Sequence, residues 1–321
     1  MIYAPIVIPT LNRAVHLKRC VDSLAKCAEA KDTELYISVD YPPSDKYLEG
    51  YEKVIEYLDN GIQGFKNVII IKQKENLGAL KNTWFLRDFV YEQYDRCIFT
   101  EDDNEFASCF LRFMNEALER YLNNQDIFAV YGAKPSVKNI ESVGNNAFLT
   151  TYFSAYGTGF WRDKEREIKR IVNRDYIEDL CCTPHKLEKI NKIFPNAITF
   201  LCSTLLRKEQ VYRSADGTVP LIDTVKMIYS VVENKYLVCS PIALVKNWGY
   251  DGSGLNCDRQ KNAAISLVSL ENAENNSIGF ADKITVLELD YPLKKDRIIP
   301  FISAWVRILV WRLIAKRKTL R

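Results

Sequence analysis

The sequence predicts an α/β protein with a mostly parallel sheet, helices on both faces and an amphipathic helical tail at the C-terminus. Strand-like apolar segments alternate four times with segments of helical periodicity over residues 4–121. The strand segments are almost continuously apolar, which indicates strands buried on both faces. The C-terminal segment 297–321 is apolar, aromatic and basic, unlike the rest of the chain.

The first half contains the four strand–helix units. The first strand is expected over the proline-bounded segment 4–9, and Asn12 is expected to cap the next helix. The later units place strands at 34–40, 67–73 and 96–103 and helices at about 47–58, 79–94 and 110–121. Ligands of open parallel sheets bind beyond the carboxyl ends of the strands. Those ends carry polar residues here, so we expect the site among them.

The second half is less regular. Segment 127–134 is typical of a strand, and about 163–212 has a helical pattern. A turn and a helix are expected over 219–235, followed by a strand, a proline break and a glycine-rich loop over 236–254. No linker separates the halves, so we expect one continuous domain over 1–262 and an extension over 263–321.

Composition excludes several classes of protein. The net charge of +3 supplies no general basic field for nucleic acid. The nine cysteines show no CxxC pair, which favours a reducing, cytosolic location. His16 and His185 are the only histidines, which argues against a histidine-rich zinc site. The segment after Met1 is typical of a strand and not of a signal peptide.

Three adjacent carboxylates, Glu101, Asp102 and Asp103, end the fourth expected strand. Acidic side chains at a strand end can hold Mg²⁺ or Mn²⁺, which prefer oxygen ligands and keep positions open for substrate oxygens. Such a cation stabilises the charge that builds on a diphosphate leaving group. The alternative is a solvated acidic turn that precedes the next helix. The position at a strand end favours the metal site.

The motifs together resemble a GT-A fold (Rossmann-like) glycosyltransferase, close to the family 2-like enzymes of bacterial surface polysaccharide and capsule biosynthesis. The matching segments occur in the family's order between residue 5 and about 254: "PIVIPTLNRAVHLKRCVDSL", "ISVDYPPSD", "ENLGALKN", "FTEDDNEF", "YFSAYGTGFWRDK" and "NWGYDGSG". The Glu-Asp-Asp motif is also similar to that of a UDP-sugar-dependent N-acetylglucosaminyltransferase. The resemblance implies a nucleotide-binding half (1–130) and an acceptor half (131–262).

The resemblance also implies roles for single residues. It places the nucleotide-sugar against Pro9, Thr10, Arg13, Asp40, Asn76, Gly78, Lys81 and Asp102. Asp40 would hold the base or ribose, and Asp102 would contact the ribose or sugar. Asp103, with Glu101 beside it, would ligate the metal through the diphosphate. Arg13 is a cation suited to diphosphate, although an ordinary surface charge is the alternative.

Inversion, which the family resemblance implies, needs one general base within hydrogen-bond reach of the acceptor hydroxyl. The acceptor half offers Asp163, Asp216, Asp223 and Asp251. Asp223 best matches the position of the base in related enzymes, and Asp251 is the second candidate. The alternatives are a helix N-cap for Asp223 and an ordinary turn for Asp251.

The segment "YFSAYGTGFWRDK" would form the wall under the donor sugar and the acceptor. Gly157 and Gly159 permit close backbone approach, and Tyr156 and Trp161 offer flat faces for sugar stacking. The alternative places Trp161 in the core. Relatives often carry a metal-reaching histidine near the end of the "NWGYDGSG" region, where this chain has "LNC" (255–257).

The C-terminal segment 297–321 is predicted to be a helix that lies on a membrane surface. A helix over 301–315 would be about 22 Å long, short for a bilayer core of ~30 Å, and it carries Arg307 and Arg312. Trp305 and the basic residues after 315 suit an interface with anionic headgroups. The alternatives are packing on the domain or on a partner subunit, and a true span.

These observations favour a metal-dependent, inverting glycosyltransferase of the hexosyltransferase type that uses a UDP-sugar. Its acceptor would be a saccharide, with a lipid-linked saccharide as one candidate, and a homo-oligomer stays open. We expect it in the cytoplasm, peripheral on the inner face of the cell membrane. One alternative is a sugar-nucleotide nucleotidyltransferase, which "IPTLNR" disfavours because it lacks glycine. The other is a non-catalytic, membrane-associated carbohydrate-binding protein.

Overall fold

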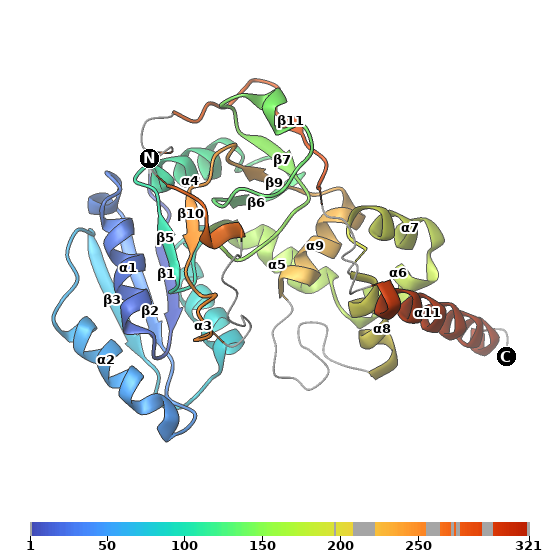
Figure 1. Cartoon of the computed structure of the whole chain (residues 1–321), viewed down its shortest axis with the longest axis horizontal. Helices are drawn as coiled ribbons and strands as arrows, with labels where there is room; N and C mark the ends of the chain where they lie inside the picture. The colour runs from blue at the N-terminus through green and yellow to red at the C-terminus, as the bar shows by residue number, and fades with distance from the viewer. Residues whose placement is uncertain are drawn as a thin grey trace.

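A nine-stranded sheet forms the centre of the molecule, as Figure 1 shows. The computed structural model describes residues 2–195, 197–207, 222–254, 264–270, 273, 277–290 and 298–319. In their order across the sheet, the strands are β11 (Thr285–Val286), β7 (Phe148–Thr150), β9 (Tyr236–Cys239), β6 (Ile127–Tyr131), β8 (Thr158–Trp161), β4 (Arg96–Phe99), β1 (Ile6–Thr10), β2 (Glu34–Val39) and β3 (Asn67–Lys72). A separate ladder pairs β5 (Asn104–Phe106) with β10 (Val245–Asn247).

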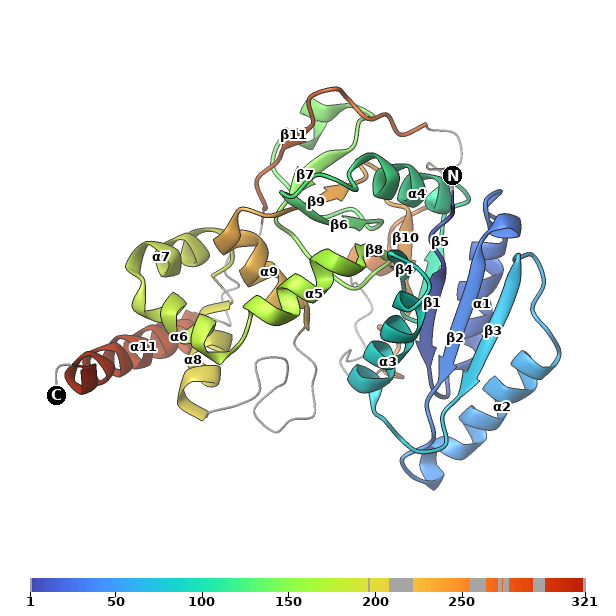
Figure 2. The same cartoon turned by 180° about the vertical axis from the view of Figure 1, so that it is seen from behind.

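Helices cover both faces of this sheet. The helices of the described residues are α1 (Ala14–Ala25), α2 (Leu48–Asp59), α3 (Ala79–Tyr91), α4 (Phe110–Arg120), α5 (Arg162–Ile171), α6 (Arg174–Cys182), α7 (Pro184–Ile193), α8 (Ala197–Arg207), α9 (Ile222–Glu233) and α11 (Ile298–Thr319). Of these, α6, α7, α8 and α11 pack mainly on other helices. α3 packs on β1, β2 and β4. The opposed views of Figures 1 and 2 show α1 on the other face of these strands.

The first half of the chain builds the parallel part of the sheet. β2 pairs in parallel with β1 and β3, and β4 pairs in parallel with β1. β1, β2 and β4 are almost wholly buried, as their apolar sequences predict. β3 is only partly buried because it is the edge strand. The carboxyl ends of these strands therefore lie at one edge of the sheet.

The second half adds strands of mixed direction. β8 lies between β4 and β6 and is antiparallel to both. β9 is parallel to β6 and antiparallel to β7, and β11 is parallel to β7. Five of the eight strand pairings are parallel, so the predicted mostly parallel α/β sheet is confirmed.

Two local expectations are wrong. The fourth strand ends at Phe99, because residues 104–106 leave the main sheet and pair with β10 as β5. The first helix begins at Ala14 with Arg13 at its N-cap position, and no side chain caps it. Asn12 is therefore not the cap.

The helical pattern of 163–212 corresponds to α5, α6, α7 and α8 within the described residues. The side chain of Asn173 caps α6 by accepting a hydrogen bond from the Tyr176 N–H at 3.0 Å. Pro184 begins α7, a position that tolerates proline. Figure 1 shows these helices and α11 far from α1 and α2. No helix of the described part is long and apolar enough to cross a membrane.

Candidate active site

The acidic turn, defined here as Glu101, Asp102 and Asp103, follows the carboxyl end of β4. It lies beside the carboxyl end of β1, because β1 and β4 are parallel neighbours. Asp102 and Asp103 are buried, with 3% and 6% of their surface exposed. Thr10, the last residue of β1, donates from its hydroxyl to Asp102 Oδ2 at 2.6 Å. Two strand ends that the sequence marked as polar therefore meet at one place.

Arg13 supplies positive charge to the acidic turn. Its Nη1 donates to Asp103 Oδ2 at 2.8 Å, and its Nη2 pairs with Asp102 Oδ1. Burial opposes the charge on Arg13, but Asp102 and Asp103 outweigh burial and raise the pKa of the guanidinium. Burial raises the pKa of Asp103, and Arg13 opposes this rise. Arg13 is therefore a bound counter-ion of the acids and not a free surface charge.

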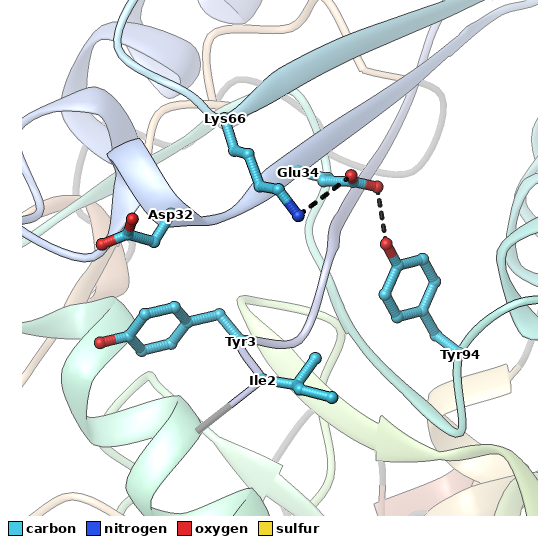
Figure 3. A pocket seen from close by; sticks show the side chains of 6 residues that line it. All are labelled: Ile2, Tyr3, Asp32, Glu34, Lys66 and Tyr94. Atoms are coloured by element: carbon cyan, nitrogen blue, oxygen red, sulfur yellow. Dashed lines mark hydrogen bonds and ion pairs between the residues drawn. The ribbon is translucent and has the colours of Figure 1, made fainter.

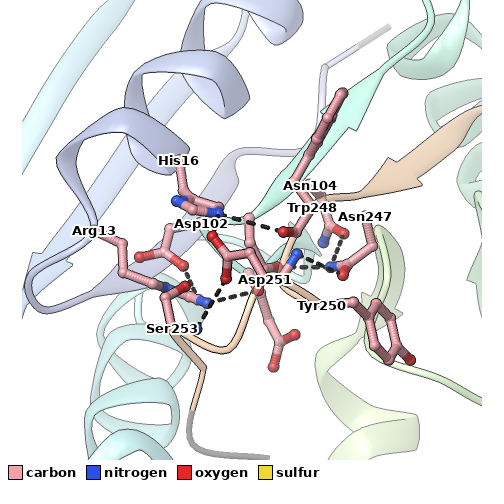
Figure 4. Close-up of polar contacts among 12 residues, drawn as sticks. Arg13, His16, Asp102, Asn104, Asn247, Trp248, Tyr250, Asp251 and Ser253 are labelled. Atoms are coloured by element: carbon pink, nitrogen blue, oxygen red, sulfur yellow. Dashed lines mark hydrogen bonds and ion pairs between the residues drawn. The ribbon is translucent and has the colours of Figure 1, made fainter. Parts of the chain in front are cut away.

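The segment that follows β10 closes over the acidic turn, as Figure 4 shows. Asn247 donates from Nδ2 to Asp103 Oδ1 at 2.8 Å, and the Trp248 N–H donates to the Asp103 carbonyl at 2.8 Å. A Cβ built on Gly249 would lie 2.1 Å from Asp103 Oδ2, so a side chain there would collide with the carboxylate. Sequence reasoning found the "NWGYDGSG" motif but assigned no role to Asn247 or Gly249.

Asp251 lies at the rim of the same site (Figure 4). Its Oδ2 is 3.2 Å from His16 Nε2, and its Oδ1 accepts a hydrogen bond from the Ser253 N–H at 2.9 Å. Burial acts to raise the pKa of Asp251, but the Ser253 hydrogen bonds and His16 outweigh it and lower the pKa. His16 was missed by sequence reasoning. Its position three residues after Arg13, one turn along α1, was the available signal.

Asp223 approaches the acidic turn from the acceptor half. It lies in the first turn of α9, is half-buried, and accepts a hydrogen bond at Oδ2 from the Ala155 N–H at 3.2 Å. Burial raises the pKa of Asp223. Burial also raises the pKa of Glu101 well above its usual range, and both Asp103 and Asp223 add to that rise. Glu101 and Asp223 are therefore close enough for their charges to interact.

A buried charge network of Arg87, Tyr91, Glu165 and Lys226 lies behind Asp223. Lys226 Nζ is 3.0 Å from Glu165 Oε1, which also pairs with Arg87 Nη1. Tyr91 donates from its hydroxyl to Glu165 Oε2 at 2.9 Å. Burial lowers the pKa of Lys226 to about 8, and Lys226 acts to lower the pKa of Asp223. The network is thus electrostatically linked to the candidate base.

Asp40 orders the loop that precedes α3. Its carboxylate accepts hydrogen bonds from the Leu77 and Gly78 N–H groups, both at 2.8 Å, and from Asn76 Nδ2 at 3.3 Å. Gly78 has φ +75°, a conformation that favours glycine. These bonds join Asp40, Asn76 and Gly78 into one unit, and their contact with a nucleotide stays a prediction. Lys81 is exposed in the first turn of α3.

The predicted donor-sugar wall divides between site and core. Tyr156 Oη lies 3.1 Å from Tyr250 Oη, which links the glycine-rich segment to the loop beside Asp251. Gly157 has φ +66°, which favours glycine. Trp161 is fully buried and donates from Nε1 to a backbone carbonyl of α4 at 3.1 Å. A Cβ on Gly159 would meet α4 side chains at 3.1 Å. Trp161 therefore belongs to the core and offers no face for sugar stacking, and the close backbone approach at Gly159 is to the side chains of α4.

The carboxylates of the acidic turn fit a cation that prefers oxygen ligands. Water or substrate oxygens would complete its coordination. Each Asp103 oxygen accepts one hydrogen bond and keeps a second lone pair. The described part of the chain contains no group of three or more His, Cys, Asp and Glu residues arranged to hold a metal. Glu101 and Asp103 stay the predicted ligands that the resemblance implies, a number that suits Mg²⁺, which proteins hold through one or two carboxylates. Asp216 and the "LNC" segment (255–257) lie outside the described residues.

A hollow of about 440 Å³ lies at the opposite ends of the strands (Figure 3). Its lining includes Glu34, the first residue of β2, and Tyr94, which precedes β4. Glu34 accepts a hydrogen bond from the Tyr94 hydroxyl at 2.7 Å and pairs with Lys66 at 3.7 Å. This hollow is therefore not part of the candidate site.

Among solved structures, the chain has a weak likeness to a xylosyltransferase. No family model matches the sequence, and no curated protein matches it significantly. The crystal structure of mouse xyloside xylosyltransferase 1 in its apo form matches with a TM-score of 0.36 and 10% sequence identity. The match covers 55% of this chain and 74% of the mouse chain. At this level the likeness concerns the chain trace alone.

Proposed function

We propose that this protein is a glycosyltransferase that moves a sugar from a nucleotide diphosphate sugar to a saccharide acceptor. The observation that carries the proposal is the acidic turn with its bound Arg13, faced by Asp223 from the acceptor half. Sugar transfer needs a charged binding site for the diphosphate and a general base at the acceptor hydroxyl. The described geometry supports both requirements, and a UDP-sugar donor follows from the family resemblance.

The donor would bind over the carboxyl ends of β1 and β4. Pro9 and Thr10 end β1, and Arg13 follows them at the start of α1. In the proposed complex, the guanidinium of Arg13 faces the diphosphate, where a planar cation can form paired hydrogen bonds. Asp102, held by Thr10, would accept hydrogen bonds from ribose or sugar hydroxyls.

A divalent cation, Mn²⁺ or Mg²⁺, is part of this proposal. Asp103 and Glu101 would hold it, and it would stabilise the negative charge that develops on the departing diphosphate. Asn247 orients the Asp103 carboxylate through its hydrogen bond at 2.8 Å. The hydrogen bond from the Trp248 N–H to the Asp103 carbonyl fixes the backbone of Asp103.

Asp223 is the proposed general base of an inverting transfer. The hydrogen bond from the Ala155 N–H orients its carboxylate. Burial raises its pKa, which strengthens its carboxylate as a proton acceptor, and Lys226 opposes this rise. The acceptor hydroxyl would give its proton to Asp223 as its oxygen attacks the anomeric carbon. Asp251 has a lowered pKa and is therefore the weaker candidate.

The cellular setting is also a proposal. The resemblance supports a hexosyl transfer in bacterial surface polysaccharide synthesis, with a lipid-linked saccharide as the candidate acceptor. A peripheral position on the inner face of the membrane would bring the site to such an acceptor.

Calorimetric titration of the full chain with UDP, GDP and dTDP, each with manganese and with EDTA, tests the donor site. We expect UDP binding that requires manganese and is lost in Asp103→Asn. The exposed Asp282→Asn is the matched control. Absence of nucleotide binding under every condition would overturn the proposal and favour the non-catalytic alternative.

The release of UDP from a panel of UDP-sugars, with water as the acceptor, tests the catalytic step. We expect Asp223→Asn to bind UDP like the wild type but to release it at least about 10²-fold more slowly, the usual contribution of a general base. Unchanged turnover in Asp223→Asn would show that Asp223 is not the general base, and Asp251→Asn would then be measured.

A further inference from the structure

Helix α11 is held to the protein by one face. Ala304 and Ile308 on that face are buried, and the helix packs on α8 and α6. Trp305 donates from Nε1 to Asn191 Oδ1 of α7 at 3.3 Å. Trp305 therefore anchors the helix to the domain and is not directed to a headgroup region, contrary to its sequence interpretation.

The opposite face of α11 is apolar and uncovered. Six large aliphatic side chains on it are 47–80% exposed, and they are Ile299, Ile302, Val306, Leu309, Val310 and Leu313. At about 100° per residue, these six positions fall within an arc of roughly 100° centred opposite Ala304 and Ile308. We call these six residues the outer face. A monomer leaves so large a contiguous patch uncovered only rarely.

Positive charge borders the outer face and no acidic residue interrupts it. Segment 298–321 contains six Lys and Arg residues and no Asp or Glu. By helical register, Arg307 and Arg312 lie on the two sides of the outer face, each about 110° from its centre. The remaining four cations follow at the C-terminal end, at 316, 317, 318 and 321.

We propose that the outer face of α11 lies in the headgroup region of a lipid bilayer that contains anionic lipid. An apolar arc bordered by cations is complementary to such a surface in both hydrophobicity and charge. A second copy of the chain is a poorer occupant, because two α11 helices would bring twelve cations together. No helix of the described residues is long and apolar enough to cross a membrane, and Arg307 and Arg312 flank the outer face of this one. This proposal does not rest on the proposed sugar transfer.

Co-sedimentation of the full chain with lipid vesicles tests the inference. We expect binding to phosphatidylcholine vesicles that contain phosphatidylglycerol, and at least tenfold weaker binding to phosphatidylcholine alone or at high salt. The triple variant Ile302→Ser, Val306→Ser, Leu309→Ser is expected to lose at least tenfold in affinity. The matched control Ile2→Ser, Leu267→Ser, Val286→Ser changes three side chains that are 51–75% exposed elsewhere and should bind like the wild type.

Three outcomes would overturn the proposal. One is no sedimentation of the wild type with either vesicle, and another is equal sedimentation of the outer-face variant and the wild type. The third is a dimer by light scattering that the outer-face variant abolishes, because a second copy would then cover this face. Circular dichroism and thermal melting identify any misfolded variant, and the outer-face side chains are 47–80% exposed, so the triple variant should keep the fold.

Discussion

The charge network behind Asp223 predicts that two neighbouring substitutions have very different effects on stability. Glu165 is 2% exposed and is shared by Arg87 and Lys226, which are 2% and 4% exposed. Glu165→Gln leaves both cations buried without their common anion. Lys226→Met keeps the Glu165–Arg87 pair and replaces a buried ammonium by an apolar group of similar length.

The magnitudes follow from the pKa values of the two groups. Burial disfavours the charge on Glu165, but Arg87 and Lys226 outweigh burial and lower its pKa from 4.5 to about 2. At about 1.4 kcal/mol per pKa unit, ionised Glu165 stabilises the fold by about 3 kcal/mol. Burial lowers the pKa of Lys226 from 10.5 to about 8, so its charge costs about 3 kcal/mol at neutral pH.

We therefore expect Glu165→Gln to lower the free energy of unfolding by about 3 kcal/mol at pH 7, in line with the loss of one partner from a buried ion pair. Lys226→Met removes the cost of the buried ammonium, so we expect it to be at least as stable as the wild type, by up to about 3 kcal/mol. Urea denaturation at pH 7 measures both through the midpoint and the m-value. Glu167→Gln, an exposed change in the same helix, is the control for α5.

The pH dependence supplies an independent check. Because the folded pKa of Glu165 is lowered, its stabilisation is complete above pH 4.5 and is lost as the pH falls towards 2. Because the folded pKa of Lys226 is also lowered, its cost is complete below pH 8 and disappears as the pH rises to 10.5. A Glu165→Gln variant as stable as the wild type, or a Lys226→Met variant destabilised equally, would refute the reasoning.

Two further predictions concern the site. Gly249→Ala places a Cβ 2.1 Å from Asp103 Oδ2, so we expect the carboxylate to rotate away and nucleotide affinity to fall at least tenfold by calorimetry. Wild-type affinity there would contradict the placement of Asp103 in the donor site. Lys226→Met removes a charge that lowers the pKa of Asp223, so we expect the acid limb of the pH–rate profile to move to higher pH. An acid limb at the wild-type pH would show that Lys226 does not influence the pKa of the general base.

The first half of the fold was predictable because its information is local. Each parallel strand is an apolar run that ends in polar residues, and each is followed by a helix of clear periodicity. The parallel order of β1, β2 and β4 then brings Thr10 and the acidic turn to one edge. Parallel strand pairing alone was therefore enough to predict that polar residues gather at this edge.

The acceptor half was less predictable because its contacts join distant segments. β8 enters the sheet antiparallel between β4 and β6, a placement that no local pattern in "YFSAYGTGFWRDK" specifies. That placement buries Trp161, whose aromatic face had suggested sugar stacking. Lys226 and Glu165 pair across 61 positions in sequence, so neither residue carries a local signal of its partner. The only sequence signal of this pair was an ionisable residue, Lys226, within an apolar helical pattern.

The ion pairs of Arg13 couple the binding of a diphosphate to the binding of a cation. Its guanidinium is already engaged with both Asp102 and Asp103, and only 18% of its side chain is exposed. A diphosphate that draws Arg13 towards itself leaves two buried carboxylates short of positive charge, and an unpaired buried charge is costly. A cation that compensates these acids removes that cost. Under the proposed function, nucleotide and divalent cation should therefore each strengthen the binding of the other, and the sign of this coupling follows from the ion pairs of Arg13 alone.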